Sequence, residues 1–167
     1  HIGRIAIDPT NSDIVYIAAY GPVWNSGGER GIYKTTDGGK TWKQVLNVSE
    51  HTGFNEVMVD PRHPNIVYAA AHQRQRKVFT YIGGGPESAL YKSTDGGANF
   101  SVVYTDDINT NILGIEISRT NTSTMYVVVR PNSGSSYIKK TVDDWVTNST
   151  LILPNGGNNQ AIISLDP

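Results

Sequence analysis

A twelve-residue segment that occurs twice constrains the fold of this chain more than any other feature of its sequence. It reads Gly-Ile-Tyr-Lys-Thr-Thr-Asp-Gly-Gly-Lys-Thr-Trp at residues 31–42 and Ala-Leu-Tyr-Lys-Ser-Thr-Asp-Gly-Gly-Ala-Asn-Phe at residues 89–100. A shorter block, an aliphatic residue followed by Asp-Pro, precedes the two copies at Ile7 and Val59. Two motifs that recur in the same order indicate tandem structural repeats.

The repeats have the length of a propeller blade. Aligned positions Asp8, Asp60, Ser118 and Asp166 recur at intervals of 52, 58 and 48 residues, which is too long for ankyrin or leucine-rich units. Each unit also contains four short segments that are rich in Val, Ile, Tyr and Thr and bounded by Gly, Pro, Asn or Asp. Such segments predict four strands in each unit.

The expected fold class is therefore all-β, with about three β-propeller blades of four antiparallel strands each. Three blades do not close a ring, because propellers generally have at least four. We expect the chain to be part of a larger propeller, completed by further blades of the same chain or by identical subunits. The predicted repeats within the partial propeller of residues 1–167 are 2–53, 54–111 and 112–160, with the start of a fourth at 161–167.

The repeated Asp motif has a local structural explanation. Its carboxylate can accept hydrogen bonds from the amides of its own turn, its glycines permit positive φ, and its aromatic residue can pack between sheets. Carboxylates on successive blades lie too far apart to share one substrate, so we assign them a structural role. The positions with this role are Thr35, Asp37, Gly39 and Trp42 in the first copy, Ser93, Asp95, Gly97 and Phe100 in the second, and Asp143 in the third.

The third copy is degenerate. Residues 141–145 read Thr-Val-Asp-Asp-Trp, so both glycines are absent and the aromatic residue comes early. Because glycine adopts positive φ most readily, we expect this turn to differ from the other two.

The motif Ser/Thr-x-Asp-x-Gly-x-Thr-Trp resembles the Asp-box, also called the bacterial neuraminidase repeat. The resemblance covers nearly the whole chain, strongly through Phe100 and weakly after it. Similar repeats occur in sialidases, xyloglucan-cleaving glycoside hydrolases, sortilin receptors, a photosystem II assembly factor and bacterial exported proteins. The resemblance implies an extracellular, cell-surface or periplasmic location, and it specifies the fold better than the activity.

Ligand recognition is expected on the face of the blades opposite to the Asp motifs. The loops between the second and third strands vary in length there, at residues 19–30, 71–88 and 130–136, and loops on rigid scaffolds usually carry recognition. Aromatic faces stack on sugar rings or peptide side chains, and arginine binds carboxylates. The candidate ligand-binding residues are Tyr20, Trp24, Arg30, His72, Arg74, Arg76 and Tyr81. In the structural alternative, Trp24 and Tyr81 fold their loops back over the blades.

Two classes of function fit these features. A non-enzymatic binding or scaffold propeller for a glycan or protein ligand needs only the loop face, and this is our prediction. The alternative, a glycoside hydrolase, needs two carboxylates about 5–10 Å apart, one with a perturbed pKa. A sialidase motif is represented only by Gly3-Arg4-Ile5-Ala6, where Ala replaces the expected Pro. The sequence does not pair any two of the carboxylates that could reach the axial face. These carboxylates are Glu50, Glu56, Glu87, Asp106, Asp107 and Glu116.

The composition argues against several other classes. Lys and Arg number 14 against 15 Asp and Glu, so no global field favours a nucleic acid or an anionic membrane. No apolar run approaches the roughly 18 residues of a membrane span. The chain has no cysteine, and its four histidines lack metal-ligand spacing, so we expect neither a metal nor a cofactor.

Overall fold

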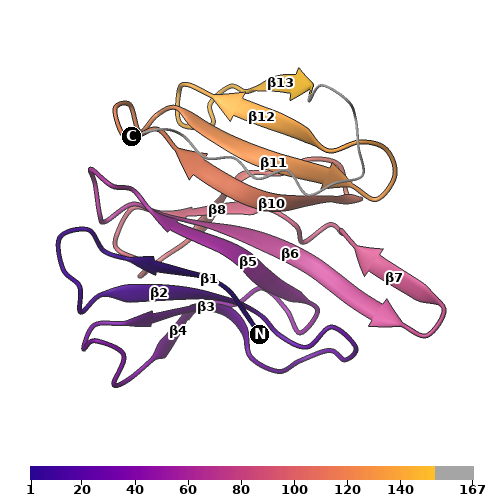
Figure 1. Ribbon diagram of the computed structural model, residues 1–167, viewed down its shortest axis with the longest axis horizontal. Helices are drawn as coiled ribbons and strands as arrows, with labels where there is room; N and C mark the ends of the chain where they lie inside the picture. Colours follow the sequence, from indigo (N-terminus) through magenta and orange to yellow (C-terminus); the bar gives the residue numbers. More distant parts are fainter. Residues whose placement is uncertain (153–167) are drawn as a thin grey trace.

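The computed structural model describes residues 1–152, which form three antiparallel sheets in chain order. Each sheet is one blade, and its strands lie side by side in the order of the sequence (Figure 1). Blade one contains β1 (Ile2–Ile7), β2 (Val15–Tyr20), β3 (Arg30–Thr35) and β4 (Lys43–Leu46). Blade two contains β5 (Thr52–Val59), β6 (Val67–Lys77), β8 (Leu90–Ser93) and β9 (Ser101–Tyr104), and blade three contains β10 (Thr110–Ile117), β11 (Met125–Pro131), β12 (Tyr137–Thr141) and β13 (Ser149–Ile152).

The prediction of an all-β chain with four-stranded blades is confirmed for the described residues. Blade two has a fifth strand, β7 (Thr80–Gly83), because the long β6 turns back on itself and pairs Lys77 with Thr80. This hairpin extends beyond the ends of the other strands (Figure 1). The predicted start of a fourth repeat at residues 161–167 lies outside the described residues.

One apolar core fills each joint, meaning the contact between two neighbouring blades. Successive side chains of a strand point to opposite faces of the sheet, so β5 contributes to both cores. Val57 packs with Ile32 and Phe54 in the core between blades one and two. Met58 packs against the core between blades two and three, which contains Ile115. The middle blade is therefore apolar on both faces.

The turns β3–β4, β8–β9 and β12–β13, here called the Asp turns, share one hydrogen-bond pattern. In the first, Asp37 accepts from the Thr41 amide at 2.9 Å and from the Thr41 hydroxyl at 2.6 Å. The Thr35 hydroxyl oxygen accepts from the Gly39 amide at 3.0 Å. These hydrogen bonds, with those of Thr41 foremost, lower the pKa of Asp37 to about 2. The carboxylate is thus engaged by its own turn.

The expectation that the third Asp turn differs is wrong. Asp143 accepts from the Thr147 amide at 2.9 Å and from the Thr147 hydroxyl at 2.6 Å, and the Trp145 amide donates to the Thr141 hydroxyl oxygen at 3.0 Å. Asp144 and Trp145 have φ values of 59° and 71°, the region that glycine occupies in the other two turns. The geometry is therefore kept without glycine.

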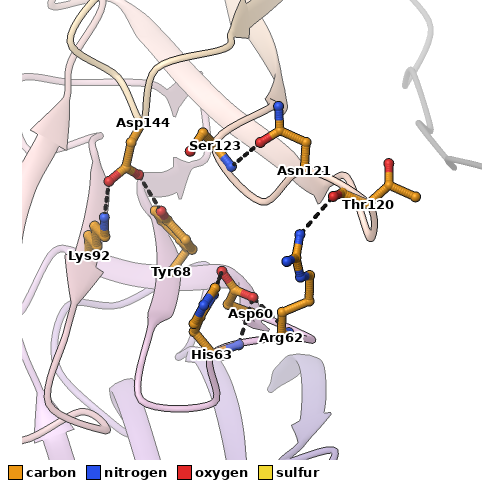
Figure 2. Close-up of polar contacts among 9 residues, drawn as sticks. All are labelled: Asp60, Arg62, His63, Tyr68, Lys92, Thr120, Asn121, Ser123 and Asp144. Atoms are coloured by element: carbon orange, nitrogen blue, oxygen red, sulfur yellow. Dashed lines mark hydrogen bonds and ion pairs between the residues drawn. The ribbon is translucent and has the colours of Figure 1, made fainter.

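Contacts across the joint explain how this strained turn is stabilised. A non-glycine residue in the left-handed region costs roughly 1–2 kcal/mol. Trp145 is buried and its ring centroid lies 4.8 Å from that of Tyr104. Asp144 accepts hydrogen bonds from Tyr68 and Lys92 of blade two (Figure 2). Burial and hydrogen bonding offset the backbone strain.

Candidate ligand-binding face

The candidate site lies at the end of the blades opposite to the Asp turns. Strands β2, β6 and β11 all run from the Asp-turn face to this face, and their strand pairings place Tyr20, His72 and Arg130 at equivalent positions. The β6–β7 hairpin extends from the same end (Figure 1). The topology thus brings the second strand and the following loop of each blade to one surface.

Arginine and aromatic side chains alternate on this surface in an arrangement that we call the arginine ladder, formed by Tyr20, Arg74, Tyr81, Arg76 and Trp24. The guanidinium carbon of Arg74 lies 5.7 Å from the ring centroid of Tyr20 and 6.0 Å from that of Tyr81. The guanidinium carbon of Arg76 lies 5.3 Å from the centroid of Tyr81 and 5.9 Å from that of Trp24. Each such contact contributes about 0.5–1 kcal/mol at an exposed site.

The ladder is accessible to solvent. Trp24 is 59% exposed and Tyr81 is 45% exposed. The loop of blade one is fastened to the hairpin of blade two, because the Arg76 amide donates to the Val23 carbonyl at 2.8 Å. This contact between the loops runs through the backbone, and the rings of Trp24 and Tyr81 keep a large exposed surface.

A pocket of about 210 Å³ opens beside the ladder, between blades two and three. Guanidinium, imidazole, phenol and side-chain amide groups line it, and no carboxylate of the described residues does. Guanidinium and amide donors are suited to binding a carboxylate or another anion. The lining residues are His72, Tyr81, Gly83, Asn111, Leu113, Arg130, Pro131 and Asn132.

His72 is uncharged at neutral pH in this pocket. Burial, and then the positive charges of Arg74 and Arg130, lower its pKa to about 4. Within residues 1–152, His72 Nε2 and Arg74 Nε are buried without a hydrogen-bond partner. A buried polar group left unsatisfied costs about 1–3 kcal/mol, so a ligand that reaches these nitrogens would gain this energy.

Arg30 is a structural residue of the loop and is not available to a ligand. It is 2% exposed. Its Nε donates to the Gly27 carbonyl at 2.9 Å and its Nη1 to the Tyr20 carbonyl at 2.7 Å. Its Nη2 donates to the carbonyls of Pro22 at 2.6 Å and Asn25 at 3.0 Å. We therefore correct the assignment of Arg30 as a ligand-binding residue, because all its nitrogens hold the backbone of its own loop.

Among the described carboxyl groups, Glu56 on β5 has a raised pKa. Burial raises this pKa, the charge of Arg4 and the amide of Val57 lower it, and the charge of Glu116 raises it slightly, and the combined result is a pKa of about 7. Arg4 Nε lies 3.2 Å from Glu56 Oε1. The three residues lie on the first strands of the three blades, and Glu56 and Glu116 do not line the pocket.

Replacing Glu56 by glutamine should remove one contribution to the pH dependence of the unfolding free energy. The pKa of Glu56 rises from 4.5 to about 7 on folding, so the folded state binds the proton more tightly and loses stability as the pH rises from about 4.5 to about 7. The difference in unfolding free energy between Glu56→Gln and the unsubstituted chain should grow by about 2–3 kcal/mol over this range. Urea unfolding at several pH values measures it, and a constant difference would contradict the assignment.

A second pocket, of about 330 Å³, lies between the Asp turns of blades one and two. Its walls include Trp42 and Asp95, and the Asp95 carboxylate already accepts hydrogen bonds from the amide and the side chain of Asn99.

Residues 1–152 contain no group of three or more His, Cys, Asp or Glu that could hold a metal ion. No helix in this part of the chain is long and apolar enough to span a membrane.

No family model and no curated protein matches the chain. Solved structures do match it. An ancestral GH74 enzyme superimposes with a TM-score of 0.64 at 16% identity over 90% of this chain and 18% of its own. A GH74 enzyme from Niastella koreensis superimposes with a TM-score of 0.61 at 21% identity, and the match covers 94% of this chain and 30% of that enzyme. YCF48 bound to D1 peptide superimposes with a TM-score of 0.56 at 16% identity, and the match covers 90% of this chain and 39% of YCF48.

These structures establish the fold class. GH74 enzymes and YCF48 are β-propeller proteins, and the three sheets of this chain match their blades. The chain spans less than two fifths of the length of each of these three proteins. At such low identity the likeness shows the fold alone, and function has to be argued from the site.

Proposed function

We propose that this chain is a non-enzymatic binding module of an extracellular, cell-surface or periplasmic propeller of the Asp-box type, and that it recognises a polar ligand on the face opposite to the Asp turns. The observation that carries the proposal is the arginine ladder beside a pocket that is rich in hydrogen-bond donors and lined by no described carboxylate. YCF48, a propeller of similar fold, has been solved with a peptide bound. A propeller of similar fold can thus hold a peptide ligand.

The charges of the face define the ligand class. The guanidinium groups of Arg74 and Arg76 lie between aromatic rings, and Arg130 lines the pocket. Guanidinium groups bind carboxylates with two parallel hydrogen bonds, and the rings of Trp24 and Tyr81 offer stacking surfaces. The ligand is therefore a glycan or peptide that carries carboxylates, such as a uronic acid oligosaccharide or an acidic peptide segment.

Substituting the two ladder arginines tests this proposal. The Arg74→Gln/Arg76→Gln variant should bind a penta-galacturonate or a penta-glutamate peptide at least about tenfold more weakly, because one charged hydrogen bond contributes about 1.5–3 kcal/mol. Calorimetric titration of both probes measures the affinities and separates the glycan from the peptide. Lys77→Gln, on the same hairpin but outside the ladder, is the matched control and should bind normally. Equal affinity of the double variant and this control would overturn the proposal.

A glycoside hydrolase is the second candidate, and the raised pKa of Glu56 favours it. A carboxyl group with a pKa of about 7 could donate a proton to a leaving group, and Glu116 would supply the second carboxylate. Release of reducing sugar from a xyloglucan oligosaccharide, lost in Glu56→Gln and retained in Arg74→Gln/Arg76→Gln, would establish the enzyme. Binding lost in the arginine variant, with no hydrolysis by any form, would establish the binding module.

A further inference from the structure

One position of the Asp turns differs between the two joints. Gly97 in the turn of blade two and Trp145 in the turn of blade three are equivalent, because each donates its amide to the hydroxyl oxygen of the residue that opens its turn, at 2.8 Å and 3.0 Å. Their φ values are 83° and 71°. The second joint therefore receives an indole ring at this position, and the first joint receives no side chain.

The indole of Trp145 fills part of the joint between blades two and three. Trp145 is 7% exposed, and its ring centroid lies 4.8 Å from that of Tyr104 on β9. It belongs to the core of this joint, and Val103 on the same strand packs against that core. This joint thus shows a flat aromatic ring held between the fourth strand of one blade and the Asp turn of the next.

The joint between blades one and two has a pocket beside the same turn position. The pocket of about 330 Å³ is lined by Gly97 itself and by Val45 on β4. Val45 and Leu46 are the equivalents of Val103 and Tyr104 in the strand pairings. The fourth strand and the following Asp turn therefore line a space in one joint and hold an indole in the other. The volume falls within the range of about 300–1,000 Å³ that is typical of ligand pockets.

The walls of this pocket suit a flat aromatic ring. Trp42 lines it and is 42% exposed, so part of its indole is open to a ligand. Aromatic rings pair in offset-stacked or edge-to-face arrangements. Lys43 also lines the pocket, and an ammonium group is attracted to the face of an aromatic ring. Gly96 and Gly97 contribute turn backbone without side chains, which leaves the space open.

Two other charged groups of the pocket are already engaged by the protein. Lys34 Nζ donates to the Gly96 carbonyl at 2.7 Å. The Asp95 carboxylate accepts from the Asn99 amide at 2.9 Å, from the Asn99 side chain at 2.8 Å and from the Ser93 hydroxyl at 2.7 Å. A strongly polar ligand would compete with these hydrogen bonds. The pocket is therefore better suited to shape and apolar surface than to a charge.

We propose that the pocket between the Asp turns of blades one and two binds the tryptophan side chain of a partner protein, and that this indole takes the place that Trp145 takes in the next joint. The occupant is a side chain because the equivalent indole is itself carried by a polypeptide. This site lies at the opposite end of the blades from the arginine ladder, so it is separate from the ligand-binding face described above.

Titration of the isotope-labelled whole chain with N-acetyltryptophanamide tests the site. The probe should bind with a Kd of about 1–5 mM and should shift the indole N–H of Trp42 and the amides of Gly96 and Gly97. N-acetylleucinamide should shift none of them. Arg74→Gln/Arg76→Gln should bind the tryptophan probe normally, which separates this test from that of the ladder.

Three results would overturn the proposal. The first is the absence of shifts with N-acetyltryptophanamide at about 10 mM. The second is equal shifts with the leucine and tryptophan probes, which would show that the site does not select an aromatic ring. The third is binding of free indole without binding of N-acetyltryptophanamide, which would assign the pocket to a small molecule.

Gly97→Trp tests the position of the indole by filling the pocket from within. It should weaken binding of the tryptophan probe at least about tenfold. A Cβ at this position would lie 3.1 Å from Tyr16 Cε1, and the core of the next joint holds both Trp145 and Tyr68, the equivalent of Tyr16. Gly97→Ala has the same positive φ and leaves the pocket open, so its affinity should stay within about twofold of the unsubstituted chain. Equal losses in the two variants would contradict the assignment.

Trp42→Ala provides a test that does not depend on the folding of Gly97→Trp. It removes an exposed wall of the pocket and should weaken binding of the probe at least about threefold, because an aromatic pair is lost. Trp24→Ala, at an exposed position on the opposite face, is the matched control and should bind normally. Unchanged affinity in Trp42→Ala would place the probe outside this pocket.

Discussion

Replacing Arg30 by methionine should lower the free energy of unfolding by about 3–5 kcal/mol. The side chain is buried and donates to four carbonyls of its own loop. Methionine fills similar space without any donor, so these carbonyls lose their partners, and each buried one costs about 1–3 kcal/mol unless water reaches it. Urea unfolding followed by circular dichroism gives the value.

Arg30→Lys is the matched control for this prediction. A single ammonium group keeps the charge but lacks the planar fork that reaches several acceptors at once. The free energy of unfolding of Arg30→Lys should lie between those of Arg30→Met and the unsubstituted chain. Because the same loop holds Trp24, the methionine variant should also shift tryptophan emission and weaken ligand binding. A loss of less than about 1 kcal/mol in Arg30→Met would show that the loop keeps its conformation without these hydrogen bonds.

Replacing Gly53 by alanine should separate blades one and two at the loop face. A Cβ at this position would lie 2.3 Å from the Cα of Tyr20 and 2.7 Å from its carbonyl carbon and oxygen. These are backbone atoms of another blade, so no rotation of a side chain relieves the overlap. Overpacking costs about 1–3 kcal/mol where neighbours can adjust, and more where they cannot. We expect a loss of at least about 3 kcal/mol in unfolding free energy.

Gly114→Ala provides the comparison for Gly53→Ala. Gly114 lies on β10, the first strand of blade three. A Cβ added at this position would lie 3.8 Å from Val128 Cγ2, which is an ordinary van der Waals contact. The unfolding free energy of this variant should stay within about 1 kcal/mol of the unsubstituted chain. Equal effects of the two substitutions would show that strand propensity, and not the approach of Tyr20, determines the cost.

The blades were predictable because their signals are local. The Asp motif specifies a turn through its own hydrogen bonds, and Asp37 in the structure makes the contacts that its motif implies. The third turn was predicted wrongly for the same reason. Its positive φ values are stabilised by Tyr68, Tyr104 and Lys92 of the preceding blade, and a rule based on local sequence does not include them.

The candidate site could be predicted in part. The variable loops of the sequence predict the five ladder residues and His72, but not the alternation of rings and guanidinium groups. Arg30 belongs to the same loops, and a sequence does not show that an arginine folds inward. Arg130 and Asn111, which line the pocket, are not among the candidates from the sequence. Aligning the ends of β2, β6 and β11 would have identified Arg130, since it is equivalent to Tyr20 and His72.

Amide chemical-shift mapping tests the central claim, that ligands bind opposite to the Asp turns. Titration of the isotope-labelled chain with penta-galacturonate or penta-glutamate should shift the amides of residues 20–30, 72–83 and 130–132, and should leave those of the Asp turns in place. Shifts centred on the Asp turns or on Glu56 and Glu116, or no shifts at about 1 mM of either probe, would contradict the account.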